Sequence, residues 1–275
     1  MNTINKNLFL RRVRRFILIA FSALLGLQIL PARAAEYTFV VQPILPPSET
    51  RKAFEPLAAY LSQATGQQIK LVTALNFLTY WETMKQKKYQ LILDAAHFTG
   101  YRVTHMGYNV LAKIPGEVSY TLVTGPNTMV LGASDLIGKT IATIAPPSLG
   151  AVRLAQLFPN PLRQPVIVEV NNSVDAIRDV LQGKVIAALV PSPLVQQYPN
   201  LNTVLTTDPV PHIALSAAPS VPKPMQEAIK NALLNADKTP AGKAMLKAIN
   251  FPGFVPTNAQ RYAPYGKLLQ GTWGY

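Results

Sequence analysis

The sequence predicts an α/β protein made of two lobes, joined by a two-stranded hinge with the ligand cleft between them. Short β-rich runs alternate with helical stretches along most of the chain, and this β-α series occurs twice. Such a series is typical of a largely parallel sheet with helices packed on its faces. Three further helical stretches at the C-terminal end have no strands of their own, so we expect them to pack on the first lobe.

The first series predicts four strands and three helices. The strands are expected over residues 37–41, 69–73, 90–93 and 110–114, and the helices over residues 50–65, 78–87 and 99–106. The first helix should end at Gly66, because glycine readily adopts the left-handed conformation that terminates helices.

The second series follows an extended segment at residues 119–124. Strands are expected over residues 140–144, 166–170, 185–189 and 204–207, and helices over 149–157, 173–181 and 194–197. After an extended segment at residues 212–216, helices are expected over 222–237, 241–248 and 258–269, the last interrupted by Pro264.

Two crossovers between the lobes, near residues 119–124 and 211–216, are expected to form the hinge. The first lobe is then discontinuous, with residues 35–120 and 213–275, and residues 121–212 form the second lobe. Open α/β sheets bind ligands at the carboxyl ends of their strands, so we expect the site in the cleft between the lobes. Hinge closure is the expected binding mechanism.

Residues 1–34 have the features of a cleaved secretory signal peptide. A basic segment that includes Arg11, Arg12, Arg14 and Arg15 precedes an apolar stretch from Phe16 to Leu30 and the cleavage site Ala32-Arg33-Ala34. The apolar stretch is shorter than the roughly 20 residues that a membrane-spanning helix needs. Cysteine is absent, which excludes disulfides, thiolate metal sites and a lipidated cysteine anchor. A free periplasmic protein is expected.

Composition narrows the possible functions further. Six of the 26 basic residues precede residue 35, which leaves 20 bases against 13 acids and a moderate positive charge that suits an anionic ligand. The bases are scattered, so no nucleic-acid partner is expected. The chain has no G-x-S-x-G motif and only three histidines, so an enzyme is not expected. We expect a monomer without a cofactor.

Several motifs, in this order and spacing, resemble the periplasmic phosphate/phosphite/phosphonate-binding proteins of ABC transporters. They occur at residues 53–62 (AFEPLAAYLS), 80–84 (YWETM), 88–91 (KYQL), 135–142 (DLIGKTIA), 147–150 (PSLG) and 180–185 (VLQGKV). The resemblance implies the type II periplasmic binding protein fold. It also implies a solute-binding protein that captures a small phosphate- or phosphonate-like anion by hinge closure for an ABC permease.

The chain departs from the family pattern where the ligand should bind. The family's Ser-Thr-Ser-Gly turn, which holds the anion at a helix N-terminus, is reduced here to Ser148 and Gly150, with Leu149 between them. Ser173 stands in the place of a family histidine, and Ile186 in that of an aspartate. The resemblance implies ligand contacts at Ser148, Gly150 and Ser173, although Ser148 is equally explained as an ordinary helix N-cap.

Further candidates follow from the residues themselves. Asp94 and His97 come after the third strand and are spaced to form a hydrogen-bonded pair at the cleft, with Tyr101 or Arg102 nearby. The alternative is that Asp94 caps the next helix and His97 packs locally. The crossovers and the loops of the second lobe add four candidates: Tyr120, Thr121, Ser192 and His212.

Two other classes of function remain open from the sequence. A metal-binding transport component could use Asp94, His97, His105 and His212, although their spacing matches no common metal motif. A ligand sensor that docks on a membrane receptor is the second alternative, and surface charge does not distinguish it from a transport protein.

Overall fold

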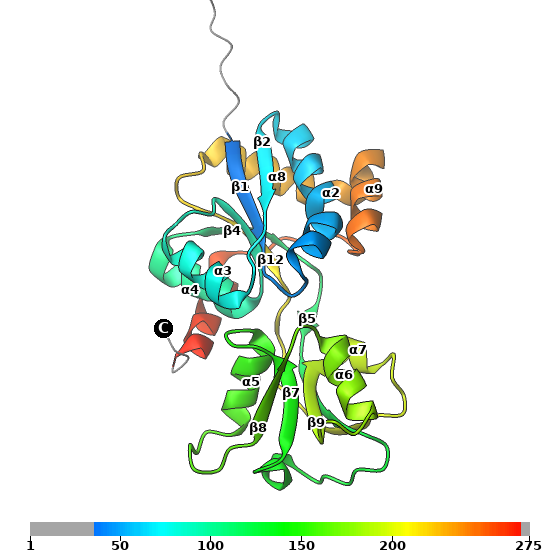
Figure 1. Ribbon diagram of the computed structural model, residues 1–275. Helices are drawn as coiled ribbons and strands as arrows, with labels where there is room; N and C mark the ends of the chain where they lie inside the picture. Colours follow the sequence, from blue (N-terminus) through cyan, green and yellow to red (C-terminus); the bar gives the residue numbers. More distant parts are fainter. Residues whose placement is uncertain (1–35, 271–275) are drawn as a thin grey trace, which may run out of the picture. The chain divides into compact units, whose positions relative to one another are not determined.

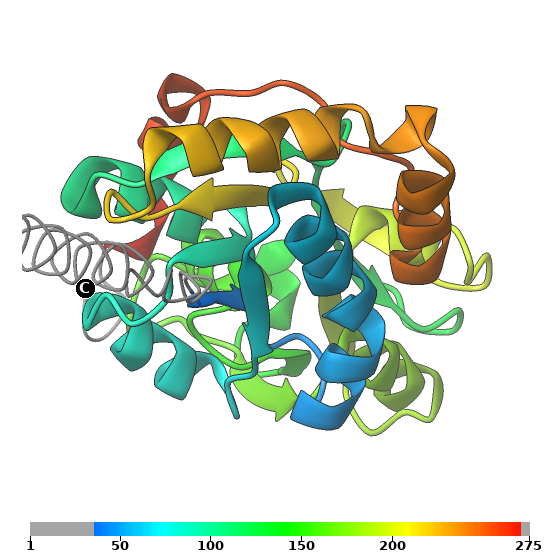
Figure 2. The ribbon, with the colours of Figure 1, turned by 90° about the horizontal axis from the view of Figure 1, so that it is seen from above.

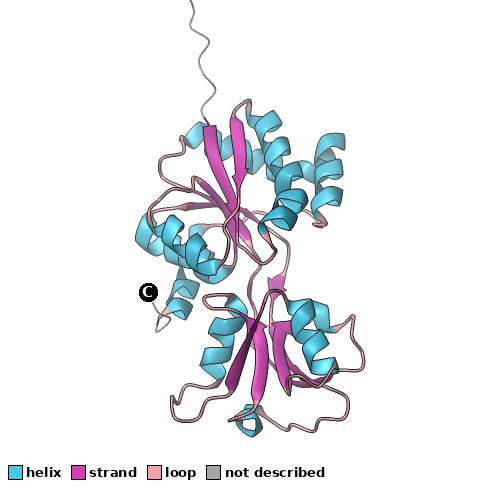
Figure 3. Cartoon of the chain, in the orientation of Figure 1, coloured by secondary structure: helices cyan, strands magenta, loops and turns pink. Residues whose placement is uncertain are grey.

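The computed structural model describes residues 36–270, so the expected signal peptide lies outside the described residues. Its strands form two five-stranded sheets and one two-stranded sheet, with helices packed against the two larger sheets (Figures 1 and 3). Within residues 36–270, no helix is long and apolar enough to cross a membrane.

The first sheet has the strand order β2-β1-β3-β12-β4. Its strands are β1 (Glu36–Val41), β2 (Gln68–Val72), β3 (Leu91–Asp94), β4 (Asn109–Lys113) and β12 (Ala214–Ala217). β1 is parallel to β2 and β3, whereas β12 is antiparallel to both of its neighbours. The crossover expected at residues 211–216 is corrected in part: its second half, residues 214–216, belongs to β12, a central strand of this sheet that pairs on both edges.

The helices of the first lobe come from both ends of the chain. The N-terminal ones are α2 (Pro47–Thr65), α3 (Phe77–Lys85) and α4 (Ala96–Met106), and the C-terminal ones are α8 (Lys223–Leu234), α9 (Pro240–Ile249), α10 (Ala259–Tyr262) and the 3-10 helices η2 (Ala236–Lys238) and η3 (Ala263–Leu269). α2 ends at Gly66, which has a φ of 64°, as expected. α2 packs against α8 and α9, and α4 packs against α10 and η3 (Figure 2).

The contact of α4 with η3 brings two backbones together at a pair of glycines. A Cβ atom on Gly100 would lie 2.4 Å from the carbonyl oxygen of Tyr262 and 2.5 Å from the nitrogen of Gly266. Only glycine permits this approach. The terminal helices thus pack on the first lobe, as their lack of strands led us to expect.

The second sheet has the strand order β10-β6-β9-β7-β8. Its strands are β6 (Tyr120–Thr124), β7 (Thr140–Ile144), β8 (Val166–Val170), β9 (Ala187–Pro191) and β10 (Asn202–Thr206), and its helices are α5 (Leu149–Leu157), α6 (Ser173–Leu181), α7 (Ser192–Val195) and η1 (Ala133–Leu136). Leu122 and Ile141 join the apolar cluster that includes residues of α5, while the alternate residues Val123 and Ala142 join the cluster of α6. The sheet is therefore buried on both faces.

The hinge is a separate two-stranded sheet of β5 (Glu117–Val118) and β11 (Val210–Pro211), in which Val118 pairs with Val210. The hinge expected at residues 119–124 is corrected, because β6 occupies those residues and pairs with β9 and β10. The predicted two-stranded hinge is confirmed, but its strands lie just outside the two larger sheets. The lobe boundaries predicted from the sequence remain a prediction.

Candidate functional site

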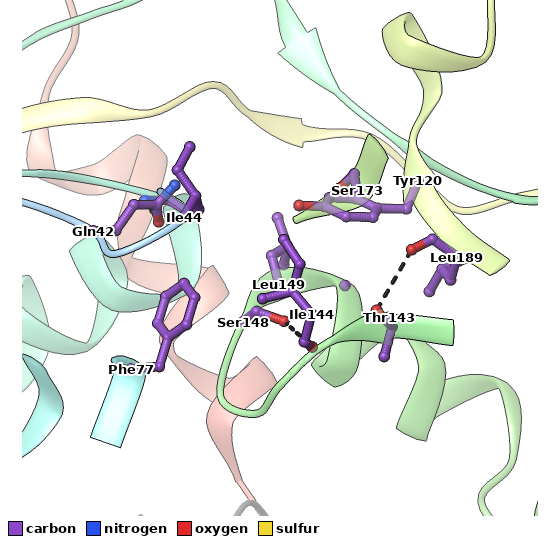
Figure 4. Close-up of a pocket in the computed structure, with 12 residues that line it drawn as sticks. Gln42, Ile44, Phe77, Tyr120, Thr143, Ile144, Ser148, Leu149, Ser173 and Leu189 are labelled. Atoms are coloured by element: carbon purple, nitrogen blue, oxygen red, sulfur yellow. Dashed lines mark hydrogen bonds between the residues drawn. The ribbon is translucent and has the colours of Figure 1, made fainter. Parts of the chain in front are cut away.

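The candidate site is a cavity of about 30 Å³ where loops of both lobes meet (Figure 4). Elements of the first sheet and its helices contribute Gln42, Ile44, Phe77 and Ala95. Elements of the second sheet and its helices contribute Tyr120, Thr143, Ile144, Ser148, Leu149, Gly150, Ser173 and Leu189. The loops and helix starts concerned follow the carboxyl ends of β1, β2, β3, β7 and β8. This is the position that the predicted fold assigned to the ligand.

Four helices begin at the cavity. Phe77 opens α3, Ala95 precedes α4, Ser148 precedes α5 and Ser173 opens α6. The first N–H groups of a helix lack partners within it, and the aligned peptide dipoles give its N-terminus a partial positive charge. The four helix ends therefore contribute partial positive charge at the cavity, although none of its lining residues has a charged side chain.

The N-terminus of α5 supplies free donors. The hydroxyl of Ser148 accepts the N–H of Ala151 at 3.2 Å and donates to the carbonyl of Ile144 at 2.8 Å (Figure 4). Among the described residues, the N–H groups of Leu149 and Gly150 have no hydrogen-bond acceptor. Ser148 is thus an N-cap, the alternative left open by the sequence, and the free donors are the two backbone N–H groups after it.

Gly150 allows Tyr120 to lie against the first turn of α5. A Cβ atom at position 150 would lie 2.9 Å from Oγ1 of Thr143 and 3.1 Å from Cε1 of Tyr120. Because real Cβ contacts are rarely so short, any larger residue would displace the tyrosine ring. Glycine is therefore needed at position 150 because a side chain would collide with Tyr120 and Thr143. Its backbone φ angle does not itself require glycine.

The hydroxyl of Tyr120 is a further donor. It points into the cavity in Figure 4 and has no hydrogen-bond partner among the described residues. Burial raises the pKa of Tyr120 to about 12, while the positive charge of Arg153 opposes this rise. The phenol is therefore protonated at neutral pH and able to donate.

Gln42 was not predicted from the sequence. Its Oε1 atom accepts the N–H of Ala95 at 3.1 Å, which fixes the orientation of the amide and leaves Nε2 as a donor without a partner among the described residues. The residue is only 9% exposed, and its amide end points toward the cavity (Figure 4). The only possible signal in the sequence was its position directly after the first strand.

Asp94 lies behind the cavity in a buried ion pair. Its two carboxylate oxygens accept both terminal nitrogens of Arg102, at 2.5 and 2.7 Å, and further bonds from the hydroxyls of Tyr80 and Thr99. Both side chains of the pair are 0% exposed. The geometry therefore corrects the expected position of Asp94 at the rim of the cleft. The carboxylate neither lines the cavity nor caps α4, whose N-cap is Ala95.

His97 is also completely buried, and its contact joins the two lobes. Its Nε2 lies 2.9 Å from the carbonyl oxygen of Pro147, in the loop before α5, and Nδ1 has no partner among the described residues. Burial lowers the pKa of His97 to about 4, although the Pro147 carbonyl opposes this shift. The expected Asp94–His97 pair is not formed, because each side chain has a different partner.

The remaining predicted residues divide into two groups. Tyr120, Ser148, Gly150 and Ser173 line the cavity together. Thr121, Ser192 and His212 do not: the hydroxyls of Thr121 and Ser192 lie 2.7 Å apart, and Nδ1 of His212 accepts the N–H of Ile213 at 2.8 Å. For the metal alternative, no three histidine or acidic side chains come together anywhere in residues 36–270.

Two lobes, a two-stranded hinge and a cavity at the carboxyl ends of the strands define the type II periplasmic binding protein fold. The family model of the ABC transporter, phosphonate, periplasmic substrate-binding proteins matches residues 39–262. The chain belongs to this family. Its members are binding components of transporters, so the protein is not an enzyme. Among curated proteins, no sequence matches.

Solved structures with the same fold share little sequence with this chain. The Xanthomonas citri protein XAC2383 bound to ATP has a TM-score of 0.72 and 12% identity, covering 86% of this chain and 98% of its own. PhnD1 from Prochlorococcus marinus in complex with methylphosphonate has a TM-score of 0.72 and 14% identity, covering 85% and 97%. A binding protein component of an ABC phosphonate transporter from Pseudomonas aeruginosa has a TM-score of 0.71 and 14% identity, covering 86% and 85%.

Proposed function

We propose that this protein captures a small oxyanion of the phosphate or phosphonate type in the cavity. The observation that carries the proposal is the pair of free N–H groups on Leu149 and Gly150 in a cavity where four helices begin. Helix N-termini bind anions through their N–H groups and dipoles, without a cationic side chain. The Nε2 of Gln42 and the hydroxyl of Tyr120 add two donors on other sides of the cavity.

Charge and size support the same ligand class. Arg153 is half-buried on α5, near enough to Tyr120 to affect its pKa, and adds positive potential. The cavity volume of about 30 Å³ has room for roughly two water molecules, or for one compact polar group. Two of the similar structures hold ATP and methylphosphonate, which both carry phosphorus oxyanions.

The proposal includes the transport context. The protein is secreted with a cleaved signal peptide at residues 1–34, works in the periplasm as a monomer and delivers its ligand to an ABC permease. Lobe 1 comprises residues 35–120 and 213–275, and lobe 2 comprises residues 121–212, which close about the hinge when the ligand binds.

Calorimetry with phosphate, phosphite, methylphosphonate and acetate tests the proposal. At least one of these anions should bind with measurable heat, and Tyr120→Phe should weaken that binding by roughly 10- to 100-fold, because a hydrogen bond to a charged group is lost. Tyr60→Phe is the matched control, since the Tyr60 hydroxyl bonds the carbonyl of Ala232 far from the cavity. If none of the four anions binds, the proposed function is wrong.

A further inference from the structure

Two groups of hydrogen-bond donors reach the cavity from different sheets. One is the Nε2 of Gln42, and the other is the pair of N–H groups on Leu149 and Gly150 in the first turn of α5 (Figure 4). Gln42 follows β1 of the first sheet, whereas α5 follows β7 of the second sheet. The distance between the two groups therefore depends on how α5 is held against the first sheet and its helices.

The first turn of α4 contacts both groups. The N–H of Ala95, the N-cap of α4, donates to Oε1 of Gln42 at 3.1 Å. Two residues further on, Nε2 of His97 lies 2.9 Å from the carbonyl oxygen of Pro147, the residue before the N-cap of α5. Because a carbonyl oxygen only accepts, Nε2 carries the proton and donates it. One helix end thus holds the Gln42 amide and the start of α5.

The first turn of α5 packs with the first sheet rather than with its own. Leu149 and Val152 belong to the apolar cluster of the first sheet, whereas Leu154, further along the helix, belongs to a cluster of the second sheet. The ring of His97 lies on that of Phe98, with centroids 4.1 Å apart. Apolar contacts bring α5 to α4 without a preferred direction, so the bond from His97 to Pro147 supplies the directional contact.

Space filling does not explain the imidazole. The side chain is 0% exposed, and its Nδ1 has no hydrogen-bond partner within residues 36–270. Burial of an unpartnered polar atom costs free energy that an apolar side chain would avoid. His97 does not line the cavity either. The contact that distinguishes it from an apolar residue of similar size is its bond to Pro147.

We propose that His97 is a positioning residue of the anion site. Through its hydrogen bond to Pro147 it holds the free N–H groups of α5 within reach of the same anion as the Gln42 amide. The inference rests on the proposed anion-binding function and deepens it, because it assigns the spacing of the donors to a residue outside the cavity. Binding groups act together only when such supporting contacts keep them within about 0.5 Å of their productive positions.

Three substitutions of His97 test the inference by calorimetry with phosphate, phosphite, methylphosphonate and acetate. In His97→Gln the amide nitrogen is as many bonds from Cα as Nε2 of histidine, so it can reach the Pro147 carbonyl and should keep the wild-type affinity. His97→Asn carries the same amide on a side chain one methylene shorter, and His97→Leu has no donor. Both should weaken anion binding by roughly 3- to 10-fold, because one neutral hydrogen bond is lost.

Tyr108→Phe is the matched control for a loss of stability. The Tyr108 hydroxyl donates to the carbonyl of Tyr89 at 2.6 Å, a buried bond between the segments that lead into β3 and β4. This variant should be less stable in urea and keep the wild-type anion affinity. If it loses as much affinity as His97→Leu, or if His97→Gln and His97→Asn bind equally, the inference is wrong and the proposed function stands. If no anion binds to the wild type, both are wrong.

A double-mutant cycle tests the spacing itself. Gln42→Met removes the Nε2 donor and keeps most of the side-chain volume. Without that donor the anion can follow the first turn of α5, so His97→Leu should weaken binding by less than about twofold in the Gln42→Met background. The same loss from His97→Leu in both backgrounds would contradict the role assigned to His97.

Discussion

Asp94→Asn should destabilise the protein severely, because it removes the negative charge that compensates a completely buried guanidinium. The carboxylate accepts bonds from Arg102, Thr99 and Tyr80, and both side chains of the ion pair are 0% exposed. Removal of one partner from such a pair typically costs about 3–5 kcal/mol. For a domain of this size, each kcal/mol lowers the melting temperature by roughly 2–4 °C, so a drop of roughly 6–20 °C is expected.

Urea unfolding and thermal melting of the purified mature protein measure this effect. Asp179→Asn is the matched control, because the pair of Asp179 with Lys184 is on the surface and should be worth less than about 1 kcal/mol. A double-mutant cycle that adds Arg102→Met should recover part of the loss, since the uncompensated charge is removed. If Asp94→Asn instead unfolds like the wild type and loses its ligand, Asp94 contacts the ligand and the structural reasoning is refuted.

Three further changes probe the surroundings of the cavity. The wild-type protein should lose about 2 kcal/mol of stability between pH 7 and pH 5, because the folded-state pKa of His97, about 4, lies below the unfolded value of about 6.5. His97→Gln has no group that titrates here, so its stability should not show this loss. Urea unfolding at the two pH values measures the difference. Ser148→Ala should lose about 0.5–2 kcal/mol of stability in urea through the N-cap, and Ser148→Gly much less. Gly150→Ala should displace the Tyr120 ring and weaken anion binding in calorimetry. Gly132→Ala is the control and should leave anion affinity unchanged, because a Cβ atom there meets nothing within 4 Å. Equal anion affinities in the two variants would contradict the role assigned to Gly150.

Elements with strong local signals were predictable from the sequence. α5, α6 and β8 have the predicted bounds, because Ser148 and Asn172 cap the two helices and β8 is a run of β-branched residues. The partners of the extended segments were not predictable. Residues 119–124 and 212–216 read as extended, but nothing in their own sequence shows that β6 and β12 pair inside the larger sheets.

The candidate site was predictable only in part. Ser148, Gly150, Ser173 and Tyr120 were found through the family resemblance and the crossover argument, and they do line the cavity. Gln42 was not predicted as a site residue, because the orientation of its amide depends on the N–H of Ala95, which is far away in the sequence.

Asp94 was misplaced for a similar reason. Its spacing to Arg102 was visible in the sequence, but the complete burial of both side chains depends on packing against distant elements, including the contact of Arg102 with Ser216 of β12.

The central position of β12 determines the order in which a chain made from its N-terminus can fold. The second sheet draws all of its strands from residues 120–206, so it is complete once that segment is available. The first sheet lacks the strand between β3 and β4 until residues 214–217 follow, and its helix layer also waits for α8, α9 and η3. The first sheet, whose strands begin at the N-terminal end of the chain, is therefore completed after the second sheet. Until β12 is added, the edges of β3 and β4 are open to pairing with other chains.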